Sequence, residues 1–185
     1  MSRWEPNAQQ RLREAAMELY LERGFDDTTV AEIANRAGLT ERTFFRHFAD
    51  KREVLFWGSS ALQDLIVGAV NDAPAAASPI DAVAAGLEAT AAVFRDVDFS
   101  RKRQAVIAST PELRERELIK MATLAAATAE ALRRRGVNEP GASLAAEAGI
   151  AVFKVAFERW IHKGNKRDFA DLVHDSLDEL KTVTR

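Results

Sequence analysis

Residues 29–48 read TVAEIANRAGLTERTFFRHF, and this stretch decides the fold of the N-terminal part of the chain. Thr29 and Glu32 have the spacing of a capping box, which begins a helix. Thr40 has the side chain of an N-cap and begins a second short helix. Gly38 lies between them, in a tight turn whose positive φ glycine adopts without strain. Two short helices joined in this way are typical of a helix-turn-helix.

The second helix has an apolar face and a polar face. Phe44 and Phe48 lie four residues apart, so we expect both to pack inward. The opposite face then holds Arg42, whose guanidinium can bind O6 and N7 of guanine together. Since a recognition helix places its N-terminal side chains on base edges, Arg42 is the predicted base reader. An ordinary helical hairpin, with the same arginines facing only solvent, is the alternative interpretation.

The polar face predicts a set of contacts with duplex DNA. Thr43 can touch a thymine methyl or a base acceptor, and Glu41 can accept from cytosine or simply stabilise the helix N-terminus. Hydroxyl groups at the helix N-termini and the basic side chains suit phosphates, which position a protein without reading sequence. The predicted DNA-contacting residues are Thr29, Thr40, Glu41, Arg42, Thr43, Phe45, Arg46, His47 and Lys51.

Residues 24–55, GFDDTTVAEIANRAGLTERTFFRHFADKREVL, resemble the DNA-binding segment of the TetR family of transcriptional repressors. Two positions depart from that pattern. Phe45 stands where the family usually has a tyrosine whose hydroxyl meets a phosphate, so it is expected to pack on sugar or a thymine methyl instead. Arg42 stands where a small residue is common, which favours it as a sequence reader. The matching positions are Gly24, Phe25, Thr28, Thr29, Val30, Ile33, Ala34, Ala37, Gly38, Leu39, Thr40, Thr43, His47, Phe48, Lys51, Val54 and Leu55.

The resemblance implies a homodimer with about nine helices per subunit, the last two of which form the interface. It also implies a pocket enclosed by helices four to seven with part of helix eight. A small apolar or amphipathic effector in that pocket would release the protein from a near-palindromic operator. On this basis residues 1–52 are expected to form the helix-turn-helix domain. Residues 53–185 would form the ligand-binding and dimerisation domain, with helix four bridging the two.

The remainder of the chain also has the pattern of helices. Alanine, the best helix former, is the most frequent residue, and no run alternates apolar and polar residues for long enough to make a strand. We therefore predict an all-α chain. Asp50 has the side chain of an N-cap for helix four, and Ser78 followed by proline has that of an N-cap for helix five. The predicted helices span residues 8–23, 29–36, 40–47, 51–70, 79–94, 99–108, 111–135, 142–163 and 168–182.

Two sets of apolar residues are candidates for further sites. Aromatic and methionine side chains suit an adaptable pocket, although a plain core uses the same residues at the same spacing. The pocket candidates are Phe94, Phe99, Met121, Phe153 and Trp160. Small residues on helix eight and an apolar face on helix nine suit close packing, either between two subunits or within one. The dimer candidates are Ala145, Gly149, Val152, Ala156, Leu172, Leu177 and Leu180.

The formal net charge of −2 on its face argues against a nucleic-acid partner. The charge is unevenly spread, because residues 36–52 hold five basic and two acidic side chains and the rest of the chain is acidic. A weakly acidic whole lowers non-specific DNA affinity and leaves discrimination to the recognition helix. The run Arg101-Lys102-Arg103 is interpreted as a solvated face rather than a second DNA-binding patch.

Other classes of protein have less support. The chain has no cysteine, which excludes thiol chemistry, and it has none of the common hydrolase, metalloprotease or phosphate-loop motifs. We expect no enzyme activity, no cofactor and no metal; a helical module that binds protein remains the alternative. The longest stretch without Asp, Glu, Lys or Arg has 10 residues, against roughly 20 in a membrane span, and the N-terminus lacks a signal-peptide pattern. We therefore expect a cytoplasmic protein without a membrane partner.

Overall fold

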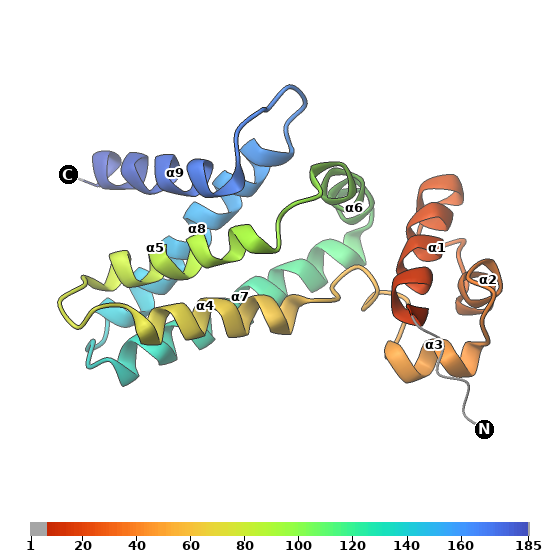
Figure 1. Ribbon diagram of the computed structural model, residues 1–185, viewed down its shortest axis with the longest axis horizontal. Helices are drawn as coiled ribbons and strands as arrows, with labels where there is room; N and C mark the ends of the chain where they lie inside the picture. Colours follow the sequence, from red (N-terminus) through yellow and green to blue (C-terminus); the bar gives the residue numbers. More distant parts are fainter. Residues whose placement is uncertain (1–6, 185) are drawn as a thin grey trace. The chain divides into compact units, whose positions relative to one another are not determined.

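The computed structural model describes residues 7–184, and this part of the chain is helical without strands (Figure 1). The all-α prediction is confirmed, with nine α-helices and one 3-10 turn among the described residues. None of these helices is long and apolar enough to span a membrane. The elements are α1 (Ala8–Arg23), α2 (Val30–Arg36), α3 (Glu41–His47), α4 (Ser59–Asp72), α5 (Pro79–Ala89), η1 (Thr90–Ala92), α6 (Val97–Ser109), α7 (Pro111–Arg134), α8 (Gly141–Ile161) and α9 (Phe169–Val183).

The chain divides into two compact units. The first joins the N-terminal segment through Trp57 to Lys102–Glu117, and the second joins Gly58–Arg101 to the segment that begins at Leu118. Helices α6 and α7 therefore each contribute to both units. The predicted domain boundary at residue 52 does not include the contribution of Lys102–Glu117 to the first unit. As a boundary between the DNA-binding and ligand-binding functions, residue 52 stays a prediction.

In the first unit, α1, α2 and α3 pack around one small core. Leu12, Ile33 and Phe44 are fully buried there. The capping box predicted at Thr29 is present in full, because its hydroxyl accepts from the Glu32 amide and the Glu32 carboxylate accepts from the Thr29 amide. Gly38 has a φ of 66°, as the predicted turn requires. The helix-turn-helix geometry predicted from the sequence is thus confirmed.

The predicted start of helix four at Asp50 is wrong. Residues 51–58 form successive turns, and α4 begins at Ser59 after Gly58, whose φ is 87°. The Asp50 carboxylate caps only a local turn, since its Oδ1 accepts from the amides of Arg52 and Glu53 at 2.8 and 3.1 Å. The apolar periodicity of this segment reflects burial of its side chains and does not continue a helix.

The second unit packs α4, α5, α8 and α9 around a larger core (Figure 1). Ser78 caps α5 and Pro79 occupies its first turn, as predicted. The residues predicted for the dimer interface lie in or against this core. Gly149, Val152, Ala156, Leu172 and Leu177 are buried, and Ala145 and Leu180 pack partly buried against them. The five buried residues therefore pack within the subunit and leave little surface for a second copy, whereas the assignment of Ala145 and Leu180 to the dimer interface stays a prediction.

Gly149 shows why helix eight carries small residues. A Cβ added at this position would lie 2.3 Å from Cγ1 of the buried Val83 on α5. The absence of a side chain thus lets α5 and α8 approach closely within one subunit. The stripe of small residues on α8 serves close helix packing within the core.

We expect Gly149→Ala to destabilise the protein by about 1–2 kcal/mol, because overpacking costs about 1–3 kcal/mol and exceeds the roughly 1 kcal/mol by which alanine favours a helix. Gly68→Ala in α4 is the matched control, since a Cβ there meets no atom within 4 Å. Urea unfolding should show the control unchanged or more stable. Two variants of equal stability would contradict this packing.

Candidate nucleic-acid interface

The recognition helix α3 is fixed by its N-cap and by its apolar face. The Thr40 hydroxyl accepts from the Thr43 amide at 3.2 Å, which defines the first turn. Phe44 is fully buried and Phe48 nearly so, with ring centroids 5.5 Å apart. The predicted inward face is confirmed, and the rotation of the helix about its own axis is determined by it.

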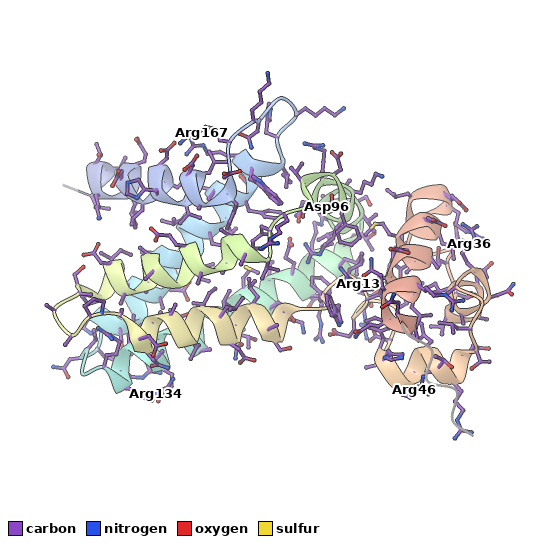
Figure 2. All side chains as sticks on the ribbon, viewed as in Figure 1. Arg13, Arg36, Arg46, Asp96, Arg134 and Arg167 are labelled. Carbon is purple, nitrogen blue, oxygen red and sulfur yellow. The ribbon has the colours of Figure 1, made fainter. Side chains whose placement is uncertain are left out.

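The opposite face of α3 presents side chains that the protein itself does not use. Glu41, Arg42, Phe45 and Arg46 are exposed, and 55% of Phe45 is accessible to solvent. Neither guanidinium has a hydrogen-bond or ion-pair partner within residues 7–184, and Figure 2 shows Arg46 extending from the helix. Phe45 rests edge-on against Phe44, with centroids 5.5 Å apart. Two cations and one aromatic ring are therefore available to a ligand on a rigid surface.

Three of the five basic side chains in residues 36–52 are engaged within the first unit. Arg36 bonds to Glu22 and Glu18 on α1, and these carboxylates raise the pKa of its guanidinium. Arg52 pairs with Asp50 at 2.6 Å. Of these five basic side chains, only Arg42 and Arg46 are thus left without a partner within residues 7–184.

Lys51, predicted as a phosphate contact, has a different role in the structure. Its Nζ donates to the carbonyl oxygens of Phe25, Asp26 and Thr28 at 2.8, 3.2 and 2.8 Å. It also lies 4.3 Å from the centroid of the Phe25 ring. Because an ammonium has three donors, none remains for a phosphate. Lys51 fastens the loop that precedes α2, and the sequence gives no signal for these three carbonyls.

Lys51→Ala should lower the free energy of unfolding by about 1–2 kcal/mol, because three carbonyls lose a charged donor. Thermal unfolding followed by circular dichroism measures this loss. Lys102→Ala, at an exposed lysine, provides the control. Unchanged stability together with a flatter salt dependence of DNA binding would return Lys51 to the phosphate-contacting set.

The remaining predicted contacts differ in availability. The Thr29 hydroxyl donates to Glu32 at 2.8 Å, so the capping box occupies its proton. Hydrogen bonds from Thr29 lower the pKa of Glu32, which keeps that carboxylate charged beside the hydroxyl. The oxygens of Thr40 and Thr43 lie 3.1 Å apart. His47 is half-buried, and its Nε2 has no protein partner among the described residues. These roles in DNA contact stay predictions.

The basic run 101–103 is not a uniform solvated face. Lys102 is exposed, but the other two side chains are partly buried and bonded to backbone. Arg101 Nε donates to the carbonyl of Ile161 at 2.7 Å, and Arg103 Nε donates to that of Leu55 at 2.6 Å. The interpretation as a solvated face is therefore wrong for both arginines.

In the second unit, several pocket candidates meet in one aromatic cluster. The Phe94 ring lies 5.7 Å from Phe153, 5.8 Å from Trp160 and 4.7 Å from Phe169. Phe157 and Phe169, which are not among the predicted pocket residues, complete the cluster. Phe157 could have been found from its four-residue spacing to Phe153 on α8, and Phe169 from its place on the apolar face of α9. Met121 packs at the edge of the same core, and Phe99 is half-buried on α6.

A hollow of about 590 Å³ lies elsewhere in this unit, at the turn between α8 and α9. Its lining includes Arg159, His162, Lys163, Arg167 and Leu172. Arg159 and Arg167 both pair with Asp175, which neutralises much of its positive character. The pocket candidates named from the sequence do not line this hollow.

Comparison with known proteins places both parts of the chain. Residues 12–56 match the family described as "Bacterial regulatory proteins, tetR family". Residues 77–185, more than half of the chain, match the "MftR C-terminal domain". The chain belongs to the TetR family. The motif resemblance and the helix-turn-helix geometry agree with this assignment.

Two curated relatives of this TetR-family chain share part of its sequence. The HTH-type transcriptional regulator TcmR of Streptomyces glaucescens is 39% identical over 87 residues, which are 47% of this chain and 38% of TcmR. The mycofactocin biosynthesis transcriptional regulator MftR of Mycobacterium tuberculosis is 34% identical over 107 residues, 55% of this chain and 52% of MftR. The matches span about half of these relatives or less.

Solved structures of transcriptional regulators share the fold. A transcriptional regulator of Pseudomonas aeruginosa superposes with a TM-score of 0.68 at 19% identity, over 98% of this chain and 93% of the other. The repressor FadR of Thermus thermophilus, in complex with lauroyl-CoA, gives 0.56 at 24% identity, over 94% and 93%. The arrangement of helices in this TetR-family chain is thus one that such regulators adopt.

Proposed function

We propose that this TetR-family chain is a sequence-specific DNA-binding repressor of transcription. The observation that carries the proposal is the exposed face of α3, where Arg42 and Arg46 have no partner within the described chain and Phe45 is open to solvent. The buried Phe44 and the cap at Thr40 hold this face rigidly. Preorganised donors on a short helix after a tight turn are what major-groove reading requires.

The repressor acts as a homodimer on a near-palindromic operator, in the cytoplasm and without catalysing a reaction. Since the small-residue stripe is buried, the dimer surface must use other side chains. Leu144 and Val155 on α8 are 65% and 49% exposed. They lie eleven residues apart, about three helical turns, and so share one face of the helix. Two copies joined through this face would read half-sites related by the same two-fold axis.

The dimer is tested by light scattering of the purified chain. We expect the mass of a dimer for the wild type and a shift toward monomer for Leu144→Glu with Val155→Glu. Leu21→Glu, at an exposed leucine on α1, is the control for placing a glutamate at an exposed apolar position outside α8. A wild-type monomer at micromolar concentration would contradict this part of the proposal.

The effector is a small apolar or amphipathic molecule of the acyl-thioester class. Support comes from the cluster around Phe94, whose packed aromatic side chains would separate to admit a flexible apolar chain. The fold neighbour FadR binds lauroyl-CoA, which gives a defined first probe. Binding within the second unit would change the geometry of the dimer and release DNA.

The function is tested by selecting duplexes from a random pool with the purified protein. We expect enrichment of one near-palindromic sequence, bound at least 1000-fold more tightly than random duplex, as is usual for specific regulators. Lauroyl-CoA should then weaken operator binding without weakening random-duplex binding. Recovery of no enriched sequence would contradict the repressor, whereas an operator insensitive to lauroyl-CoA would contradict only the ligand class.

A further inference from the structure

The segment 51–57, which we term the connector, joins the end of the recognition helix to α4 without forming a helix itself. It consists of turns, and Val54, Leu55 and Phe56 are buried within it. The chain reaches it directly from α3 through three residues. Since regular backbone hydrogen bonding does not hold the connector, its side chains and carbonyls must do so.

On one side, the connector is fastened to α1 and to the loop before α2. The Tyr20 hydroxyl donates to the Lys51 carbonyl at 2.7 Å, and the Lys51 ammonium bonds to the carbonyls of residues 25, 26 and 28. The Arg13 guanidinium lies 4.2 Å from the centroid of the Trp57 ring. These contacts come from the three-helix core itself.

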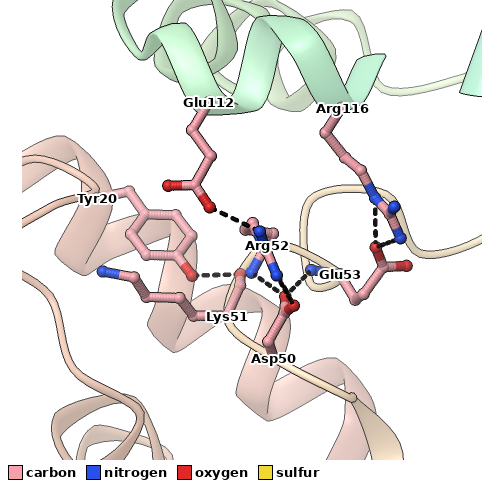
Figure 3. Close-up of polar contacts among 7 residues, drawn as sticks. All are labelled: Tyr20, Asp50, Lys51, Arg52, Glu53, Glu112 and Arg116. Carbon is pink, nitrogen blue, oxygen red and sulfur yellow. Dashed lines mark hydrogen bonds and ion pairs between the residues drawn. The ribbon is translucent and has the colours of Figure 1, made fainter. Parts of the chain in front are cut away.

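On the other side, the connector is held by residues 102–117, which we term the α6–α7 corner. Arg52 Nη1 pairs with Glu112 Oε1 at 2.7 Å, and Arg116 donates through Nε and Nη2 to Glu53 Oε1 at 2.9 and 2.5 Å (Figure 3). The two pairs have opposite polarity. The neighbouring residues Arg52 and Glu53 have opposite charges. They thus pair with Glu112 and Arg116, which also have opposite charges and lie one helical turn apart on α7.

A third contact from the corner reaches the backbone of the connector. Arg103 Nε donates to the Leu55 carbonyl at 2.6 Å, and its guanidinium lies 5.3 Å from the centroid of the Phe56 ring. Glu117 stands 3.8 Å from the same guanidinium. Burial lowers the pKa of Arg103, while Glu117 opposes that change. The corner is consequently part of the same compact unit as the recognition helix.

We propose that Glu112 and Arg116 are positioning residues for DNA recognition. Through Arg52 and Glu53 they fix the connector, and the connector fixes the C-terminal end of α3 against the three-helix core. The reciprocal polarity of the two pairs favours this register of the connector on α7, because an exchange of partners would place Arg52 beside Arg116 and Glu53 beside Glu112. This inference rests on the proposed DNA-binding function and assigns to it two residues far outside the helix-turn-helix.

The test compares two double variants that leave net charge unchanged. Glu112→Gln with Arg116→Gln removes both ion pairs. Arg114→Gln with Glu115→Gln is the matched control on the same turns of α7, because both side chains are exposed and neither has a partner within residues 7–184. Because the net charge is constant, any change in operator affinity reports positioning and not bulk attraction to phosphates.

We expect the first double variant to bind the selected operator about five- to tenfold more weakly, which is the sum of two partly exposed pairs. Its affinity for random duplex should stay within twofold of wild type, and the control should match wild type on both. Circular dichroism confirms that each variant is folded at the assay temperature.

A charge swap supplies the readout that a merely structural effect would not give. Arg116→Glu alone should weaken operator binding, and Glu53→Arg with Arg116→Glu should restore at least half of the loss. This pair is chosen because Arg52 also bonds to Asp50, so its reversal would create a new repulsion. Failure of the swap to rescue, or equal binding by the two double variants, overturns the inference. A wild type that selects no operator instead overturns the proposed function, and the inference with it.

Discussion

Phe169→Ala should lower the free energy of unfolding by about 3–5 kcal/mol, as expected for an aromatic side chain removed from a well-packed core. Phe169 is 2% exposed, and its ring lies 4.7 Å from Phe94, 5.7 Å from Phe153 and 5.8 Å from Trp160. Truncation leaves three aromatic rings facing a cavity, and each loses favourable contacts. Urea unfolding at fixed protein concentration measures the loss.

Val93→Ala is the control for this prediction, because Val93 adjoins Phe94 in sequence but is 51% exposed. Its stability should stay within about 0.5 kcal/mol of wild type, as surface substitutions usually do. If Phe169→Ala costs less than about 1 kcal/mol, the aromatic cluster is not a packed core. An open cavity already present among these rings would then be the better description.

Arg42→Ala should reduce discrimination between operator and random duplex by about 1–3 kcal/mol, which corresponds to roughly five- to 150-fold in the affinity ratio. The physical reason is the loss of a bidentate contact with one base edge. Arg42 is exposed and has no partner within the described residues, so its removal disturbs no interaction inside the protein. Fluorescence anisotropy with both duplexes at matched salt measures the ratio.

Arg46→Ala is the counterpart that separates base reading from phosphate contact. We expect it to weaken binding to all duplexes alike and to flatten the salt dependence by about one unit of slope. The specificity ratio should remain that of wild type. Equal behaviour of the two variants would show that Arg42 does not read bases.

The helix-turn-helix was predictable because local rules determine it. The capping box at Thr29, the N-cap at Thr40 and the positive φ at Gly38 each depend on residues within four positions. The inward face of α3 follows from the spacing of Phe44 and Phe48. These features depend only on helix geometry, and the structure confirms them.

The connector and its supports were not predictable in the same way. Arg52 and Glu112 lie 60 residues apart, and Arg116 and Glu53 lie 63 apart, so no local pattern relates them. The start of helix four could not be predicted because Val54, Leu55 and Gly58 continue the apolar spacing of α4 toward the N-terminus, although residues 51–58 form turns. The role of Lys51 could not be predicted because its carbonyl partners lie more than 20 residues away in a loop.

The stripe of small residues on α8 shows how one pattern serves two kinds of packing. A glycine such as Gly149 permits close approach of any helix, whether from the same subunit or from another. Only the position of Val83, whose Cγ1 would lie 2.3 Å from a Cβ added at Gly149, shows that the closely packed helix is α5 of the same subunit. The exposed face that contains Leu144 and Val155 carries larger apolar residues, so a search for small residues does not find it.

We propose that the exposed face of α3 reads DNA sequence through Arg42. The most direct measurement is a parallel selection from one random duplex pool with the wild type and with Arg42→Ala. We expect the wild type to enrich a motif with guanine at one position of each half-site, and the variant to lose the preference at that position alone. Enrichment of the same motif by both proteins would contradict it.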